Sequence, residues 1–187
     1  NGDVMICDND NVMANNERSG ILGKARYMAP EIVTGEAGPD KYSDRFSLSV
    51  LLFLLIYASH PFEGAKVLAC PCLTEKFEKE FYGSKALFIY DPTDKSNLPV
   101  QGVHTNVIRR WPVFPRELRE MFTKEFSQDK LKNKTLRCIE GDWRRVFVKV
   151  RDQLVICPHC HEETFSETGK CTFCRKSLNL TQVIKIG

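Results

Sequence analysis

The chain has 187 residues, of which 42% are hydrophobic and 27% are charged, and its formal net charge at pH 7 is +3. These proportions are typical of a globular protein and exclude a collagen, a coiled coil and a disordered chain. The small net charge does not by itself indicate a nucleic-acid or membrane partner. The longest apolar run, residues 48–58, is too short to cross a bilayer, and residues 1–3 lack the basic start of a signal peptide. We therefore expect a soluble, cytoplasmic protein.

The pattern of the first residues predicts a strand followed by a turn. A short apolar run, Val4 to Cys7, is closed by Asp8, Asn9 and Asp10, which are turn-forming residues. The chain begins with Asn1 rather than Met and opens within this strand. We therefore expect it to be a fragment of a longer protein.

A long helix is expected from residue 43 to residue 58. This segment is apolar on every side for three turns, which is typical of a helix at the centre of a soluble domain. Ser43 or Asp44 is expected to cap its start, and His60 and Pro61 to end it.

The next segment, residues 65–112, combines a helical pattern at 73–81, a strand-like run at 86–90 and a polar loop at 91–102. Two amphipathic helices are then predicted from near-helical spacing of apolar residues, one after Pro115 and one after residues 140–142. The apolar positions are Leu118, Met121, Phe122 and Phe126 in the first helix and Trp143, Val146, Phe147 and Val150 in the second. The basic residues of 109–151 are interpreted as the solvated faces of these helices.

Two Cys-x-x-Cys pairs near the C-terminus carry the strongest chemical signal. They are formed by Cys157 and Cys160 and, after ten intervening residues, by Cys171 and Cys174. Two residues between thiolates let both sulfurs of one turn face the same ion, so two such turns provide four tetrahedral ligands. We predict a structural zinc site with no open coordination position.

Other interpretations of this region remain open. The two pairs are also compatible with two disulfides or a redox pair, and His159 or His161 with a replacement ligand, although surface positions are expected for both histidines. Nucleic-acid binding is the less favoured use of the module, because its basic rim is modest and Phe165 and Phe173 are expected to pack within it. The basic residues of this rim are Lys170, Arg175 and Lys176. The remaining cysteines, Cys7, Cys70, Cys72 and Cys138, are predicted to be ordinary thiols.

Two motifs in the first third of the chain resemble the second half of a bacterial, eukaryotic-like Ser/Thr protein kinase domain. Residues 23–31, GKARYMAPE, resemble the end of an activation segment and its Ala-Pro-Glu motif, and residues 44–50, DRFSLSV, resemble the start of the large central helix. The resemblance implies that Asp44 braces the catalytic loop and that Glu31 forms a buried ion pair with Arg137. It further implies that Lys24, Ala25, Arg26 and Tyr27 shape the substrate groove.

By the same resemblance, Asp8 aligns with the aspartate that holds Mg²⁺ against the ATP phosphates. A turn residue at the end of a strand is the competing interpretation of Asp8. Asn9 and Asp10 replace the Phe and Gly of the kinase motif, and Lys24 stands where a hydroxyl residue is usual. An active kinase and a pseudokinase therefore both remain open.

The resulting fold prediction is α+β: a mainly helical kinase C-terminal lobe over residues 1–152, followed by a small β zinc ribbon over residues 153–187. The intact protein is expected to transfer the γ-phosphate of ATP to a protein hydroxyl. This chain alone is expected to be inactive, because its sequence contains no Gly-rich loop or catalytic loop. The alternative is a pseudokinase or adaptor. Zinc is the expected cofactor of this chain and Mg-ATP that of the intact protein, with a protein substrate, a signalling partner or an associated phosphatase as partners.

Overall fold

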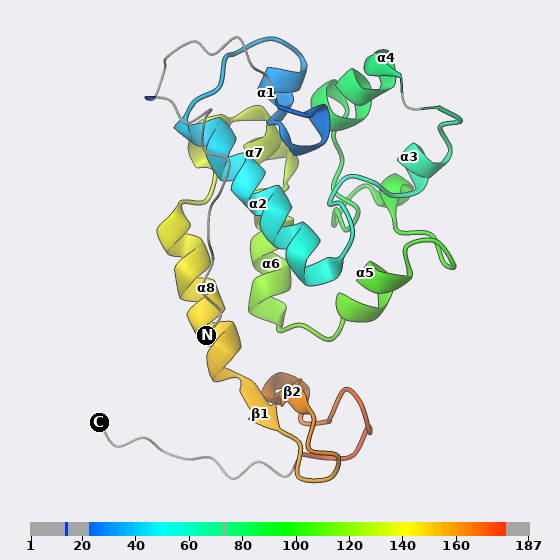
Figure 1. The fold of residues 1–187 in the computed structure, drawn as a ribbon, viewed down its shortest axis with the longest axis vertical. Coiled ribbons are helices and arrows are strands. Elements are labelled where there is room, and N and C mark those ends of the chain that lie inside the picture. Colours follow the sequence, from blue (N-terminus) through cyan, green and yellow to red (C-terminus); the bar gives the residue numbers. More distant parts are fainter. Residues whose placement is uncertain (1–13, 15–22, 73, 179–187) are drawn as a thin grey trace.

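The computed structural model describes residues 14, 23–72 and 74–178. The predicted strand at 4–7 and the predicted metal ligand Asp8 lie outside the described residues, as does the end of the predicted zinc ribbon, residues 179–187. The described chain forms a mainly helical domain followed by a small two-stranded hairpin (Figure 1).

The helical domain comprises eight α-helices within the described residues, connected by short helical turns. The α-helices are α1 (Pro30–Val33), α2 (Lys41–Tyr57), α3 (Ala65–Leu68), α4 (Glu75–Glu78), α5 (Thr105–Arg110), α6 (Arg116–Glu125), α7 (Gln128–Lys132) and α8 (Glu140–Asp152). The short turns are η1 (Ala25–Tyr27), the π-helical η2 (Lys79–Ser84), η3 (Lys95–Asn97) and η4 (Lys134–Leu136).

The long helix α2 begins and ends at other residues than predicted. Its N-cap is Asp40, whose carboxylate accepts hydrogen bonds from the backbone N–H groups of Tyr42 and Ser43 at 2.8 and 2.9 Å. Ser43 completes the capping box as the N3 residue, so it contributes to the cap without being the N-cap itself. The helix ends at Tyr57 because Ala58 adopts a left-handed conformation with φ of 49°.

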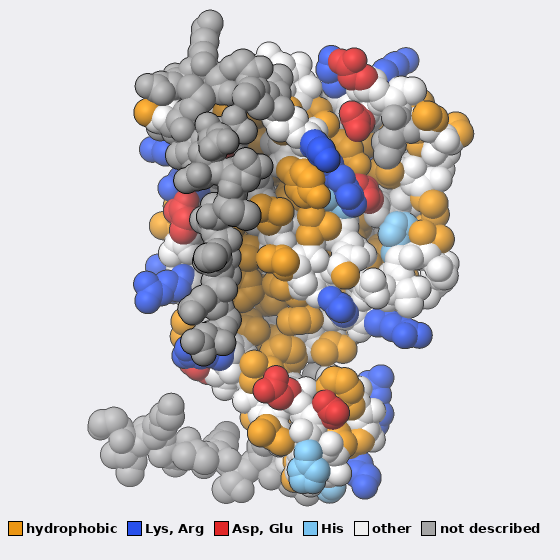
Figure 2. Space-filling model, in the orientation of Figure 1, with side chains coloured by type: hydrophobic (Ala, Val, Ile, Leu, Met, Phe, Trp, Pro, Cys, Tyr) orange, Lys and Arg blue, Asp and Glu red, His pale blue; other side chains and the backbone are white. Residues whose placement is uncertain are grey.

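Helix α2 lies at the centre of an aromatic core, as predicted. The Phe53 ring packs edge-to-face on Phe122 of α6 and on Phe88, at centroid distances of 5.1 and 5.6 Å. The expectation of burial on every side is wrong, however: Leu51 is 46% exposed and Leu55 is 78% exposed. Hydrophobic side chains gather along this helix on the face shown in Figure 2. One face of α2 is therefore uncovered by the described residues.

The strand predicted at residues 86–90 does not form, although the run is buried. Its backbone groups bond to side chains instead of a neighbouring strand: Asn97 donates to the Leu87 carbonyl at 2.7 Å, and Gln128 donates to the Ala86 carbonyl at 2.9 Å. These partners satisfy the buried peptide groups that a sheet would otherwise satisfy. The helical pattern predicted at 73–81 corresponds to α4 and η2.

The two predicted amphipathic helices are confirmed as α6 and α8. They pack against each other through Phe122 and Trp143, whose rings lie 4.8 Å apart. The interpretation of the nearby basic residues as solvated is wrong for Lys130, which is 6% exposed. Arg137, at 4% exposed, is buried, as its expected ion pair with Glu31 requires. In the part of the chain that the structure describes, no helix has the length and apolarity needed to cross a membrane.

The hairpin follows α8 almost without a break. Strands β1 (Leu154–Ile156) and β2 (Glu163–Phe165) pair antiparallel, with Val155 opposite Thr164, and the turn η5 (Ser166–Thr168) follows. The Phe165 ring packs against Phe114 of the helical domain at a centroid distance of 5.2 Å. We call residues 153–178 the cysteine module; it lies beyond the end of α8 in Figure 1.

Candidate metal centre and predicted groove

The two Cys-x-x-Cys pairs fold into turns of matching geometry. In the first, the His161 N–H donates to the Cys157 carbonyl at 2.9 Å; in the second, the Arg175 N–H donates to the Cys171 carbonyl at 3.1 Å. His161 and Arg175 both adopt positive φ, at 62° and 64°. This left-handed residue directly after each second cysteine turns the chain so that both sulfurs of a pair face inward.

The four sulfurs of Cys157, Cys160, Cys171 and Cys174 come together, as predicted. All four lie within 4.8 Å of one another. The Cys157 and Cys174 sulfurs are 3.7 Å apart, and those of Cys160 and Cys171 are 3.6 Å apart. Four thiolates about 2.3 Å from one Zn²⁺ in a tetrahedron lie about 3.8 Å from each other. The arrangement therefore fits a structural four-sulfur metal site.

Backbone N–H groups point at the first sulfur of each turn. The His159 N–H donates to the Cys157 sulfur and the Phe173 N–H to the Cys171 sulfur, both at 3.4 Å. Burial opposes ionisation of Cys171, but hydrogen bonds from the N–H groups of Cys174 and Phe173 outweigh it and lower the pKa of this thiol. A thiolate is the form that binds a metal, so the second turn favours ligation through Cys171.

The side chains around the site follow the predictions in part. His159 and His161 are exposed, as expected of surface residues. Phe165 is buried, but it packs on Phe114 rather than within the module. Phe173 is 63% exposed, so the prediction that it packs inside the module is wrong.

The expected Glu31–Arg137 ion pair is present. Arg137 Nη1 and Nη2 donate to the two carboxylate oxygens of Glu31 at 2.8 and 2.7 Å, and Nη1 also donates to the Tyr42 carbonyl at 3.0 Å. The Arg137 side chain is 1% exposed and that of Glu31 is 16% exposed. The pair joins α1 to the segment before α8, residues that are far apart in sequence.

Three of the predicted groove residues, Ala25 to Tyr27, form the turn η1, and Lys24 is its N-cap. Neighbouring segments hold this turn in place. His60 Nε2 contacts the Arg26 carbonyl at 2.7 Å, and the Phe62 N–H donates to His60 Nδ1 at 3.2 Å, so Nε2 carries the proton. Glu63 accepts from Arg26 Nε at 2.5 Å and from the Tyr82 hydroxyl at 2.7 Å. Burial lowers the pKa of His60 to about 4, which keeps the ring neutral.

A cavity of about 620 Å³ adjoins this turn. Lys24, Ala25 and Arg26 line it together with Met28 and with α1 and α4 residues, and its apolar floor includes Ile32 and Val33. Tyr27 does not line this cavity; its carbonyl accepts a hydrogen bond from Ser47 at 2.8 Å. The structure therefore brings three of the four predicted groove residues to one hollow.

Asp44 lies at the start of α2 and is exposed. Its backbone N–H donates to the Asp40 carbonyl at 3.1 Å, but its carboxyl has no hydrogen-bond partner among the described residues. Burial together with the neighbouring Asp40 raises the pKa of this carboxyl. The bracing contact that the resemblance implies for Asp44 is not among the contacts of the described chain.

A buried polar cluster was not predicted. Glu125 accepts from Lys130 Nζ at 2.8 Å, from the Cys138 N–H at 2.9 Å and from the Ser49 hydroxyl at 3.2 Å. Lys130 Nζ also contacts the Cys138 sulfur at 2.8 Å. Nothing in the sequence near any of these residues indicates the cluster, because the fold assembles it from α2, α6, α7 and the segment before α8.

The fold and the site define a class of protein in coarse terms: a mainly helical domain followed by a hairpin module with a four-cysteine cluster. No protein-family model, no curated protein and no solved structure matches the chain.

Proposed function

We propose that the helical domain is the C-terminal lobe of a Ser/Thr protein kinase-like protein, and that the intact protein transfers the γ-phosphate of Mg-ATP to a protein hydroxyl. The observation that carries the proposal is the buried, bidentate Glu31–Arg137 ion pair. Among the charged residues to which the kinase resemblance assigns roles, these two are the pair that it expects to form an ion pair. Their pairing supports the resemblance, because chance matches to short motifs do not bring the matched residues together.

Two further features support a lobe that belongs to a larger catalytic unit. The exposed leucines of α2, Leu51 and Leu55, and the exposed Asp44 lie on the central helix, which is normally covered in a complete domain. The cavity beside η1 supports a substrate groove at Lys24, Ala25 and Arg26, where a peptide side chain finds an apolar floor and charged walls.

The proposal is tested on the full-length product of the gene. Purified protein is incubated with Mg²⁺, radiolabelled ATP and a generic acceptor protein, and Asp8→Ala is compared with the wild type. We expect phosphate transfer by the wild type and a large loss in the variant, because Asp8 would no longer hold the metal against the phosphates. Equal transfer by both proteins contradicts the role of Asp8.

The second candidate is a pseudokinase or adaptor that binds a partner protein without chemistry. The exposed apolar side chains of the cysteine module, Ile156 at 66% and Phe173 at 63%, favour this candidate. Mg-dependent ATP binding without transfer, or no ATP binding at all, identifies it. A nucleic-acid function remains the least favoured; it requires affinity that falls steeply with salt.

For the cysteine module we propose that the bound metal is Zn²⁺ in a purely structural role. All four ligands are thiolates, so no position remains open for substrate or water. Metal analysis of the purified chain is expected to give one zinc per chain. If Cys171→Ser still holds one zinc tightly, the four-cysteine assignment is wrong.

A further inference from the structure

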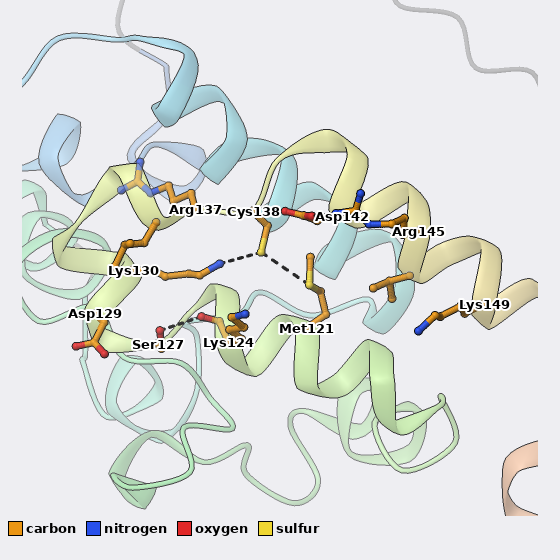
Figure 3. Close-up of a pocket in the computed structure, with 12 residues that line it drawn as sticks. Met121, Lys124, Ser127, Asp129, Lys130, Arg137, Cys138, Asp142, Arg145 and Lys149 are labelled. Atoms are coloured by element: carbon orange, nitrogen blue, oxygen red, sulfur yellow. Dashed lines mark hydrogen bonds and ion pairs between the residues drawn. The ribbon is translucent and has the colours of Figure 1, made fainter.

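A second cavity, of about 650 Å³, lies between α6, α7 and α8, away from the metal centre (Figure 3). Cys138 forms part of its wall, and the exposed side chains of Lys124, Arg145 and Lys149 belong to its lining. Cys138 therefore shares this cavity with exposed residues, although the residue as a whole is 6% exposed.

The Cys138 sulfur faces a lysine amine at short range. Lys130 Nζ lies 2.8 Å from the sulfur and 2.8 Å from Glu125 Oε2. Figure 3 shows Lys130 and Met121 pointing toward Cys138 from opposite sides, and the Met121 sulfur is 3.8 Å from that of Cys138. The side chain of Lys130 is 8% exposed and that of Glu125 is 0% exposed, so packing fixes the amine, the carboxylate and the thiol together.

Burial and the Glu125 carboxylate raise the pKa of the Cys138 thiol to about 11. Burial opposes the charge on Lys130, but hydrogen bonds to Cys138 and Glu125 outweigh it and raise the pKa of the amine. The resting pair is therefore a neutral thiol beside an ammonium, and its geometry places the two side chains for a reaction once the sulfur is oxidised. An oxidised cysteine sulfur, the sulfenic acid, is an electrophile that condenses with a nearby thiol or nitrogen. In this cluster the nearest nucleophile is the Lys130 nitrogen, and Glu125 is placed to take a proton from it. No step needs water or a ligand beyond the oxidant.

We propose that Lys130 and Cys138 form a modification site at which hydrogen peroxide joins the two side chains through a covalent sulfur–nitrogen bond. In the first step the thiol sulfur attacks one peroxide oxygen. The O–O bond breaks, an S–O bond forms, and the second oxygen leaves as water with the thiol proton. The sulfur is oxidised and the peroxide is reduced.

In the second step the Lys130 ammonium gives a proton to the Glu125 carboxylate, and the neutral nitrogen attacks the sulfur. The S–N bond forms while the S–O bond breaks. The departing hydroxide takes one proton from the nitrogen and leaves as a second water. One peroxide is consumed, and the linked pair has lost two hydrogen atoms relative to the thiol and the neutral amine. An external thiol reverses the link by attacking the sulfur and releasing the amine.

The test is peptide mapping of the zinc-loaded chain after exposure to hydrogen peroxide, without reductant. Trypsin cuts after Lys124, Lys132, Arg137 and Arg144, so the two linked residues fall on different peptides. We expect peptide 125–132 joined to peptide 138–144, with the mass of the two peptides less two hydrogens. Treatment of the digest with dithiothreitol is expected to release both peptides.

The matched control is Lys130→Arg, which keeps a cation beside Glu125 but lacks the primary amine. The joined peptides are expected to be absent from this variant, with Cys138 oxidised without a link. Cys70 and Cys72 are the internal control, because they report peroxide reactivity at sulfurs that lie outside the cluster. A wild-type digest in which Cys138 is unmodified, or oxidised but unlinked, while these two cysteines are oxidised overturns the proposal. The wild-type digest decides this even where the variant fails to fold.

Discussion

The helical domain and the cysteine module are stabilised in different ways. The domain buries many aromatic rings around α2, among them Phe53, Phe122 and Phe126, in one continuous core. Within the described residues, the buried side chains of the module's own cluster are Cys157, Cys171 and Leu178. Burial of apolar surface stabilises the first region, whereas the second has little core of its own, and we propose that it depends on a metal ion held by its four sulfurs. In this proposal the small module needs metal ligands because it buries too little apolar surface to fold without them.

The two regions are not independent, because the module supplies a contact that the domain lacks. Helix α6 begins after Pro115, which provides no side-chain cap, and the backbone N–H of Arg116 donates instead to Glu167 of the module at 2.7 Å. Phe165 packs on Phe114 beside this contact. The module therefore caps one helix of the domain.

The largest effect is expected from the loss of one cysteine ligand, which is expected to unfold the module but not the helical domain. Cys171→Ser removes one thiolate from the four-sulfur site, so the module is expected to lose its fold while α2 and its aromatic core stay intact. Hydrogen exchange resolves both regions in one experiment, and retained protection at the module's amides contradicts the dependence on metal. Cys70→Ser is the matched control, because this sulfur lies outside the cluster.

Within the domain, the largest effect is expected from the buried ion pair. Arg137→Met leaves the Glu31 carboxylate without its partner and is expected to lower the free energy of unfolding by about 3 kcal/mol, since breaking a buried pair is costly. Urea denaturation measures the loss. The control is Arg145→Met, which removes an exposed arginine paired with Asp142 and is expected to cost less than about 1 kcal/mol. Similar losses in both variants contradict the buried role of the pair.

The next effect concerns the pH dependence of the domain. Burial lowers the pKa of His60 to about 4 in the folded chain, whereas the pKa of a histidine in the unfolded chain is about 6.5. Because the unfolded state binds the proton more readily, stability from this group is fully present above pH of about 6.5 and is lost as pH falls toward 4, by about 3 kcal/mol in total. Denaturation at several pH values measures this slope, and His60→Asn is expected to flatten it. An unchanged slope contradicts the assignment.

The smallest effect tests the contact between the two regions. Glu167→Ala removes the acceptor for the Arg116 N–H and is expected to destabilise the domain by about 1 kcal/mol, the usual cost of losing a helix cap. The exchange rate of the Arg116 amide is expected to rise. Glu163→Ala, an exposed change on β2, is the control and is expected to leave that amide unaffected.

The sequence was sufficient for features that depend on local spacing. The four-cysteine cluster follows from the two Cys-x-x-Cys pairs, and α6 and α8 follow from apolar periodicity. The Glu31–Arg137 pair was accessible only through the family resemblance, because no local pattern links residues in such distant segments.

Three of the errors share one physical cause: partners that are distant in sequence decided the local structure. The run 86–90 has strand-like residues, yet Asn97 and Gln128 take the hydrogen bonds that a strand needs. Lys130 looked like a solvated residue, but Glu125 and Cys138 compensate its burial. Phe165 packs on the other region rather than on its own.

The most direct test of this account is hydrogen exchange of the wild-type chain before and after the metal is removed with a chelator. We expect the amides of Cys157 and Cys171 to lose protection, the Arg116 amide to exchange faster, and the amides of α2 to stay protected. Unchanged protection in the module after complete metal removal contradicts the claim that metal binding organises it. Simultaneous loss of protection throughout α2 contradicts the claim that the domain is stabilised by its own core.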